Sequence, residues 1–401
     1  MGTKKYLDDL LDKMLEHGGS DLHIKTKCRA RSRISGDMEF ISETSLDALF
    51  FEDLVHKVIS DDQRELLLKN KELDSHYVSS SGDRFRLNIF YHLNGIACVF
   101  RMIPTKILNI DELDLPEAVH KFVNFEKGLV LVTGTTGSGK STTLAAIIDE
   151  INRTKKHHII TIEDPIEFVH RDQLCSIEQR DVGEHTMSFQ RALKAALRED
   201  PDIILLGEMR DMETIEIALH AANSGHLVFS TLHTLDAKET IDRIVGTFPT
   251  NEQNRIAMSL SSVLAGVLCQ RLVKKIGGGR SAAVEVLIAT SRIKQMIIEK
   301  RNLEITDAIE EGEIYGMQTF DQALFNLYLE DKINLENALR AASKPDDLNL
   351  KISNIKSGSD SVSYGFKVDK SDKEFGDEQQ STVKKKKISK PKEKPALEIN
   401  R

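Results

Sequence analysis

Gly134-Thr135-Thr136-Gly137-Ser138-Gly139-Lys140-Ser141 decides the fold of this chain, because it matches the G-x-x-x-x-G-K-[ST] pattern of a phosphate-binding P-loop. The run from Gly128 to Thr133 before it is apolar, as in a buried strand, and the run from Thr142 to Ile148 after it suits a helix. The glycines let successive backbone N–H groups point into one concavity, and the helix start adds partial positive charge there. The stretch therefore predicts a site for a nucleoside triphosphate between a strand and a helix.

The loop residues have predicted contacts with the nucleotide. Lys140 is expected to reach the β- and γ-phosphates, and the Ser141 hydroxyl to hold the Mg²⁺ ion that bridges them. A glycine-rich turn without a ligand is the alternative, which the setting between strand and helix disfavours. The predicted nucleotide-binding residues are Gly134, Thr135, Thr136, Gly137, Ser138, Gly139, Lys140, Ser141 and Thr142.

Composition is that of an ordinary soluble protein with two or three domains. The chain has 401 residues, of which 40% are hydrophobic and 29% charged. No apolar run approaches the roughly 20 residues that span a bilayer, and the first residues lack a secretory signal. The four cysteines form no C-x-x-C pair, so neither a zinc ribbon nor a disulfide framework is expected. We therefore expect a cytoplasmic protein.

The net charge of −8 is unevenly distributed. Residues 381–401 carry eight Lys or Arg against two Asp or Glu, so the rest of the chain is acidic. Binding to a phosphate backbone depends on clustered basic side chains, which argues against nucleic acid as a partner and against a nucleic-acid translocase. For the tail, solvated disorder is the preferred interpretation, and a weak contact between Lys384–Lys387 and anionic lipid head groups is the alternative.

Sequence patterns divide the chain into four parts and predict an α/β protein. Residues 1–105 suit a small α+β domain with a hairpin turn at Asn94-Gly95, and residues 106–290 alternate strands and helices, as in a parallel sheet covered by helices. Residues 291–353 suit helices, and residues 354–401 suit a disordered tail. In the second part, strands are predicted at 128–133, 157–163, 202–207 and 226–232, and helices at 140–151, 187–199, 211–223 and 236–246.

An acidic cluster follows the strand predicted at 157–163. Ligands of parallel sheets bind at the carboxyl ends of the strands, where the P-loop also lies. A carboxylate there can take a proton from the water that attacks the γ-phosphate, and Glu163 is the predicted base, with Asp164 in support. A solvated loop ahead of Pro165 is the alternative.

Two further clusters end the next predicted strands. The run from Asp202 to Asp211 places Gly207 and Glu208 after four apolar residues, as in a Walker B strand, so Glu208 is expected to hold the Mg²⁺ shell. His226 and His233 bracket the following strand and could sense the γ-phosphate. Taken alone, these histidines suit ordinary core or loop positions better.

At these clusters the chain resembles the secretion and type IV pilus ATPases, and within them the pilus retraction ATPases of the PilT group. Residues 197–211 match the signature of the family over fifteen positions. The Asp box of the family corresponds to 161–168, its Walker B strand to 203–208 and its His box to 225–234. The similarity extends from Gly19 to Leu350.

The resemblance implies a hexameric ring motor that uses ATP and Mg²⁺, with nucleotide between an amino-terminal PAS-like domain and a carboxyl-terminal RecA-like domain. It assigns Glu163 as the catalytic base and Glu208 to the Walker B role. Arg86 and Arg101 match arginines of the family that reach the phosphates from the first domain, and Arg84 is a weaker candidate. Such arginines stabilise the transferring phosphoryl group only when the domains close, which couples hydrolysis to movement.

The implied role is type IV pilus retraction, which drives twitching motility. The implied partners are identical subunits, an inner-membrane pilus platform protein and another pilus ATPase, and the implied location is the cytoplasmic side of the inner membrane. Extension and secretion ATPases are disfavoured, because they usually carry a longer amino-terminal region and a cysteine-pair zinc site.

The chain also departs from the family pattern. Asn94 and Asn223 stand where many relatives have an arginine and a glutamate, and the retraction motif A-I-R-N-L-I-R-E appears only in degenerate form at Ser291–Glu299. Residues 316–339 also resemble PilU, the accessory retraction ATPase. An accessory motor of that type, or a nucleotide-dependent scaffold with little turnover, is therefore the alternative function.

Overall fold

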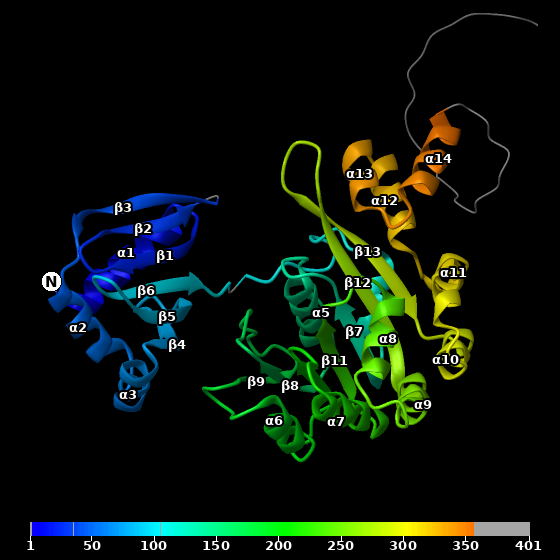
Figure 1. Ribbon diagram of the computed structural model, residues 1–401, viewed down its shortest axis with the longest axis horizontal. Helices are drawn as coiled ribbons and strands as arrows, with labels where there is room; N and C mark the ends of the chain where they lie inside the picture. The colour runs from blue at the N-terminus through cyan, green and yellow to red at the C-terminus, as the bar shows by residue number, and fades with distance from the viewer. Residues whose placement is uncertain (1, 35, 105, 357–401) are drawn as a thin grey trace, which may run out of the picture. The chain divides into compact units, whose positions relative to one another are not determined.

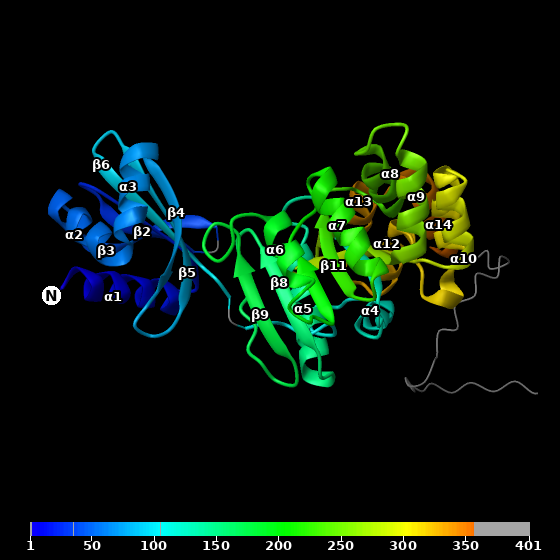
Figure 2. The same ribbon diagram turned by 90° about the horizontal axis from the view of Figure 1, so that it is seen from below.

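Two β-sheets organise the chain in the computed structural model, which describes residues 2–34, 36–104 and 106–356 (Figures 1 and 2). The first, the N-terminal sheet, has six antiparallel strands in the order β3-β2-β1-β6-β5-β4. Their bounds are β1 (Gly19–Lys25), β2 (Arg29–Ile34), β3 (Asp37–Ser45), β4 (Glu72–Val78), β5 (Arg84–His92) and β6 (Gly95–Met102).

One face of the N-terminal sheet is covered by helices α1 (Thr3–Glu16), α2 (Ala48–Val58) and α3 (Asp61–Asn70). Alternate residues of the strands, such as Leu22, Phe85 and Phe100, bury their side chains in this core. The hairpin between β5 and β6 is confirmed, with His92 paired to Gly95 and the turn therefore at Leu93-Asn94, one residue earlier than predicted.

The second sheet, the P-loop sheet, has seven strands in the order β13-β12-β7-β11-β10-β8-β9. All neighbours pair in parallel except β12 and β13, so the prediction of a largely parallel sheet is confirmed. The bounds are β7 (Gly128–Thr133), β8 (His158–Glu163), β9 (Ser176–Asp181), β10 (Ile203–Leu206), β11 (Leu227–Leu232), β12 (Leu264–Lys274) and β13 (Arg280–Ile288).

Both faces of the P-loop sheet are covered, and every residue of its central strands β7, β10 and β11 is buried, most of them apolar. In β7, Val130 and Val132 pack in the core that contains α4 (His120–Val123) and α5 (Lys140–Thr154). Leu129 and Leu131 pack in the opposite core. That core is built with α6 (Phe189–Ala196), α7 (Met212–Asn223), α8 (Ala237–Gly246) and α9 (Gln253–Val263).

Helices follow the P-loop sheet, as predicted for residues 291–353. They are α10 (Ser291–Ile298), α11 (Ile305–Glu310), α12 (Phe320–Leu329), α13 (Leu335–Ala341) and α14 (Pro345–Lys356). Helix α14 runs past the boundary expected at residue 354, and the tail predicted to be disordered otherwise lies outside the described residues. The domain boundaries themselves stay predictions. Among the helices of the described residues, none combines the length and the apolar character needed to cross a bilayer.

Candidate active site

A cavity of about 560 Å³ opens at the carboxyl ends of β7, β8, β10 and β11. These strands are neighbours in the sheet in the order β7-β11-β10-β8, so segments that are far apart in sequence meet at one edge. The polar residues that line the cavity include Thr136, Lys140, Ser141, Thr142, Glu163, Asp164, Glu167, Glu208, Arg210, Thr231 and His233. The structure therefore brings together the P-loop, the acidic cluster, the Walker B cluster and the second of the two histidines.

The P-loop is shaped by glycines that no other residue could replace at this spacing. Gly134 has φ +142° and Gly139 has φ +91°, both in the left-handed region. A Cβ at Gly134 would lie 2.4 Å from the backbone oxygen of Gln270, and one at Gly139 would lie 2.7 Å from Nε2 of Gln270. Thr143 donates a hydrogen bond of 2.7 Å to Oε1 of the same Gln270. The loop is thus packed tightly against β12.

Lys140, the first residue of α5, lies at the floor of the cavity. Its Nζ donates hydrogen bonds to the carbonyl oxygens of Gly134 at 2.9 Å and Thr135 at 3.0 Å. Burial lowers the pKa of this ammonium, while the charges of Glu167 and Glu208 act in the opposite direction. Phosphate oxygens could replace the two carbonyl acceptors without moving the side chain far.

The P-loop also contains a buried hydroxyl without a partner. Ser138 is 4% exposed, and its Oγ makes no hydrogen bond within the described residues. A buried donor of this kind costs free energy unless a ligand satisfies it. Ser138 itself does not line the cavity, whereas the glycine-shaped loop and the Lys140 ammonium do and fit a polyphosphate.

Glu163 ends β8 and lines the cavity. Its carboxylate accepts hydrogen bonds from Thr161 Oγ1 at 2.7 Å and from Gln179 Nε2 at 3.3 Å. Burial raises the pKa of Glu163 to about 7 and outweighs these two bonds. A carboxylate with a pKa close to neutral is suited to accept a proton from water.

Gln179 is a contributor that the sequence patterns did not predict. Besides Glu163, its amide donates 2.9 Å to the backbone oxygen of Phe168 and accepts 2.8 Å from the backbone N–H of His170. It therefore fixes both the carboxylate and the segment that follows it. Gln179 lies on β9, a polar strand with no apolar alternation to reveal it, and only pairing with β8 places it here.

Glu208 and His233 meet at the next strand ends. The Glu208 carboxylate is nearly buried, forms an ion pair with Arg210 and lies 3.7 Å from His233 Nε2. Arg210 belongs to the Walker B cluster but had no predicted role, and its pKa is raised mainly by the hydrogen bond to Glu208. Thr231 Oγ1 donates 2.5 Å to the carbonyl oxygen of Gly207, which ties β11 to β10 beside the cavity.

The oxygen atoms of Ser141 and Glu208 line the same cavity, as a Mg²⁺ site requires. Within the part of the chain that the structure describes, no group of three or more His, Cys, Asp or Glu could hold a metal ion alone. Mg²⁺ commonly takes only one or two protein ligands and completes its shell with phosphate oxygens and water. The residues therefore fit a Mg²⁺ ion that arrives with the nucleotide.

His226 does not reach the cavity, contrary to its predicted role. It precedes β11 at the amino end, where its Nδ1 lies 3.0 Å from the carbonyl oxygen of Ala221 and 3.1 Å from Ser224 Oγ. A strand of this length spans about 20 Å, so residues that bracket it lie at opposite edges of the sheet. Of the two histidines, His233 lines the cavity and His226 does not.

The predicted arginines lie in the N-terminal sheet. Arg86 on β5 and Arg101 on β6 are directly opposite each other, which places both side chains on the face of the sheet away from its helices. Arg101 Nε donates 2.7 Å to Asp21, and Arg86 lies 3.5 Å from Asp74. Arg84 begins the same strand β5. None of the three lines the cavity, so a contact with phosphates stays a prediction.

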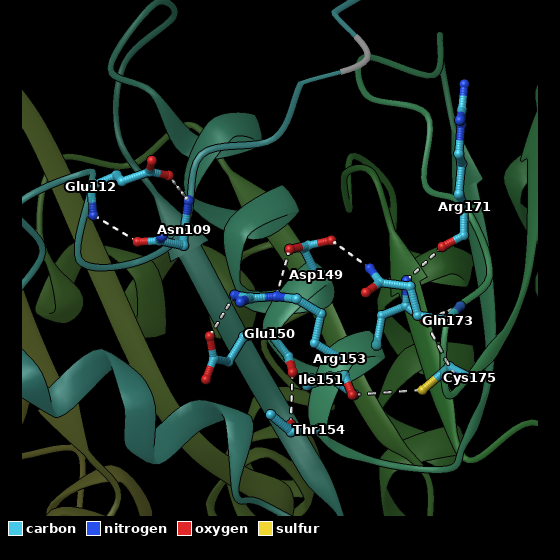
Figure 3. Close-up of polar contacts among 11 residues, drawn as sticks. Asn109, Glu112, Asp149, Glu150, Ile151, Arg153, Thr154, Arg171, Gln173 and Cys175 are labelled. Atoms are coloured by element: carbon cyan, nitrogen blue, oxygen red, sulfur yellow. Dashed lines mark hydrogen bonds and ion pairs between the residues drawn. The ribbon is translucent and has the colours of Figure 1, made fainter.

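The helix that starts at Lys140 is fixed to the segment beyond Glu163 (Figure 3). Asn152 of α5 is fully buried, and its amide donates 2.7 Å to the carbonyl oxygen of Arg171. Its Oδ1 accepts from the backbone N–H groups of Gln173 at 3.1 Å and Cys175 at 3.3 Å. The P-loop helix and the segment that leads from the cavity to β9 therefore form one hydrogen-bonded unit.

Known proteins resemble the chain over most of its length. A family model described as type II/IV secretion system protein matches residues 2–300. A Pseudomonas aeruginosa protein described as type IV pilus retractation ATPase PilT is 45% identical over 341 residues, which cover 85% of this chain and 99% of that protein. The type IV pilus ATPase PilU of the same organism is 39% identical over 355 residues, which cover 88% and 92%.

A solved structure agrees with the sequence comparison. The crystal structure of the pilus retraction motor PilT with bound ADP superposes with a TM-score of 0.81 and 42% identity, covering 86% of this chain and 99% of that one. The match extends over both sheets and into the helices that follow. It covers 86% of the chain, which is more than residues 1–290 alone contain, and it leaves too few residues unmatched to omit either sheet.

Proposed function

The chain belongs to the family of type II/IV secretion system proteins, and from that premise we propose that it is a hexameric motor that hydrolyses ATP to retract a type IV pilus. It is an ATPase of the same α/β fold as PilT. The hexamer, the pilus as the load and the residue roles are the proposed part. The single observation that carries the proposal is the cavity that joins Lys140 of the P-loop to Glu163, whose pKa is near neutral.

Binding and chemistry are divided between the two sides of the cavity. Lys140 and the N–H groups of the P-loop hold the phosphates. Ser141 and Glu208 would hold a Mg²⁺ ion, which would neutralise charge on the phosphates. Glu163 takes the proton of the attacking water at its carboxylate, held in place by Thr161 and Gln179.

His233 connects the reaction to the rest of the sheet. Its Nε2 lies 3.7 Å from the Glu208 carboxylate. Loss of the terminal phosphate would change the negative charge near both side chains, and His233 would respond through its contact with Glu208. Arg86 and Arg101 supply positive charge to the transferring phosphoryl group when the N-terminal sheet closes on a nucleotide. Closure and reopening with each turnover provide the movement that a motor needs.

The surroundings of the motor follow from its relatives. PilT is named a pilus retraction ATPase, so the proposed partners are identical subunits and the inner-membrane platform protein of a type IV pilus, with a second pilus ATPase beside them. The proposed location is the cytoplasmic face of the inner membrane. The 39% identity to PilU favours an accessory retraction motor as the second candidate function.

Replacing Glu163 by Gln tests the catalytic proposal. The variant keeps the shape and the bonds from Thr161 and Gln179 but cannot accept a proton, so ATP hydrolysis should fall by about 10²- to 10⁴-fold while nucleotide binding is retained. Phosphate release and titration with a fluorescent ATP analogue measure the two quantities. Glu126→Gln, at an exposed site before β7, is the matched control and should keep the wild-type rate.

Three results would contradict the proposal. A Glu163→Gln variant that hydrolyses ATP at the wild-type rate would exclude Glu163 as the base. A wild-type chain that binds ATP without hydrolysing it would indicate a nucleotide-dependent scaffold. In cells, deletion of the gene should leave excess surface pili without twitching, whereas cells without pili would indicate an extension motor.

A further inference from the structure

A buried carboxylate lies outside the cavity, on the side of the P-loop sheet that α8 and α12 cover. Glu285 of β13 is 4% exposed and accepts a hydrogen bond of 2.8 Å from the backbone N–H of Ala237. The backbone N–H of Phe320 also lowers the pKa of Glu285, as a nearby donor does. Ala237 and Phe320 are the first residues of α8 and α12, so the positive ends of two helix dipoles converge on one carboxylate.

Arg271, on the neighbouring strand β12, contacts the same two regions. Its guanidinium lies 3.8 Å from the ring centroid of Phe320 and donates from Nη1 to the carbonyl oxygen of Ala341 at 2.8 Å and to Ser343 Oγ at 3.2 Å. Its Nη2 lies 3.5 Å from the carbonyl oxygen of Leu235. Arg271 therefore joins α12 and the end of α13 to the segment that follows β11.

That segment carries His233, the histidine of the cavity. Thr234, the next residue, shares a hydrogen bond of 2.7 Å with Thr240, which donates 3.5 Å to Thr133 directly before the P-loop. From Leu235 to Ala237 the segment is held by Arg271 and Glu285. Its position is thus defined on one side by β7 and on the other by the Glu285–Arg271 pair.

We propose that Glu285 and Arg271 are positioning residues for ATP hydrolysis, which act by holding the His233 segment against helices α12 and α13. The inference rests on the proposed function, since it concerns the rate of the same reaction. Burying a carboxylate is costly, and here the cost is offset by the Ala237 N–H bond at the start of α8 and by the backbone N–H at the start of α12. Helices α12 and α13 pack on β13 and β12, so Arg271 and Glu285 connect these helices to the segment that carries His233 (Figure 1).

The charges around Glu285 agree with a role that depends on ionisation. Burial raises the pKa of Glu285 to about 7, the Ala237 bond and the Arg271 charge lower it, and the Asp236 charge raises it. Cys269, opposite Glu285 on β12, is fully buried, and burial raises its pKa as well. The charge of Arg271 and the N–H groups at the two helix starts therefore favour the ionised form of Glu285 against the effect of burial.

Glu285→Gln tests the proposal, because glutamine keeps the shape and one acceptor for the Ala237 N–H but removes the charge. The expected result is a kcat about tenfold lower with a KM for ATP that changes less than about twofold. Arg271→Lys should act in the same direction, because a lysine cannot reach all three acceptors. Glu336→Gln, an exposed change on α13, is the control and should have no effect.

A double variant separates a positioning role from general destabilisation. If Glu285 acts through His233, Glu285→Gln should lower kcat no further when His233 is already alanine. Effects that multiply would overturn the proposal, and so would a Glu285→Gln variant with the wild-type kcat. Should Glu285→Gln fail to fold, the same cycle with Arg271→Lys and His233→Ala decides.

Hydrogen exchange distinguishes a failure of this inference from a failure of the proposed function. In the full chain without nucleotide, the amides of residues 233–237 should exchange about tenfold faster in Glu285→Gln than in the wild type. Unchanged exchange would overturn the inference even if ATP hydrolysis is established. Absence of phosphate release from the wild-type chain would instead refute the proposed function. The exchange rates of residues 233–237 would then still show whether Glu285 holds this segment in place.

Discussion

Burial shifts the pKa values of Glu163 and Lys140, the two ionisable side chains of the proposed reaction, in opposite directions. It raises the pKa of Glu163 to about 7 and lowers that of Lys140, because removal from solvent disfavours the charged form of either group. Thr161 and Gln179 offset part of the effect at Glu163. The result is a base that is close to half ionised at neutral pH, beside an ammonium that gains from a phosphate partner.

The pH dependence of hydrolysis should report the ionisation of Glu163. Because only the carboxylate can accept a proton, kcat/KM for ATP should rise with pH through about 7 and then level off. Gln179→Ala removes a hydrogen bond that lowers the pKa, so its midpoint should move to higher pH. Rate profiles between about pH 5 and pH 9 measure both midpoints.

The control for that profile is Gln173→Ala, whose side chain bonds Asp149 and not Glu163. Its midpoint should equal that of the wild type. A flat profile, or a Gln179→Ala midpoint below that of the wild type, would show that Glu163 does not set the pH dependence.

At the scale of elements, α5 is fixed at both ends but to opposite edges of the sheet, at the cavity by its first residue and beside the start of β9 by its carboxyl end. Its first residue is Lys140, and near its carboxyl end Asn152 pairs with backbone groups of residues 171–175. Because Asn152 is fully buried, Asn152→Ala would leave these backbone groups without partners. The variant should lose roughly 3 kcal/mol of unfolding free energy in urea denaturation.

Arg153 on the same helix provides the matched control. Arg153 is exposed and pairs with the half-buried carboxylates of Asp149 and Glu150 at the helix surface, so Arg153→Ala should change the unfolding free energy by about 1 kcal/mol or less. Equal losses of unfolding free energy in Asn152→Ala and Arg153→Ala would show that the buried Asn152 side chain contributes no more to stability than a surface ion pair.

The strands that could be predicted from the sequence are β7, β8, β10 and β11, whose residues are mostly apolar and buried. Strand β7 was located at its observed bounds, because the P-loop marks its end. Strand β9 was missed, because an edge strand such as Ser176–Asp181 needs no apolar alternation. Strand β12 was missed for a different reason, since α9 ends at Val263 and β12 begins at Leu264 with no turn residue between them.

The same logic explains the candidate site. The position of Glu163 and Glu208 at the cavity could be predicted because they stand at the ends of apolar strands whose carboxyl ends share one edge, whereas that of His233 was expected only from the His box of the family. Gln179 and Gln270 could not, because their places depend on the order of strands in the sheet, which local sequence does not determine. His226 was assigned to the site through its motif, although it lies at the opposite end of the strand.

At the scale of the whole molecule, the chain carries buried carboxyl groups on both sides of the P-loop sheet. Glu163 lies in the cavity, and Glu285 lies between the starts of α8 and α12. Burial raises the pKa of each to about 7, from an ordinary value of 4.5. Both groups are therefore placed where folding opposes their ionisation, in contrast to surface carboxylates that pair with lysine or arginine.

The unfolding free energy should consequently contain a component that falls as the pH rises. Between pH 4.5 and about 7 the folded chain keeps protons on Glu163 and Glu285 that the unfolded chain has released. The stabilisation is complete below pH 4.5 and is lost as the pH rises through about 7, with up to roughly 3 kcal/mol for each group. Urea denaturation at about pH 5.5 and about pH 8 should show a smaller decrease for the Glu163→Gln, Glu285→Gln double variant than for the wild type. An equal decrease in both proteins would mean that these carboxyl groups ionise as easily in the folded chain as in the unfolded one, which would remove the physical basis for Glu163 as a near-neutral base.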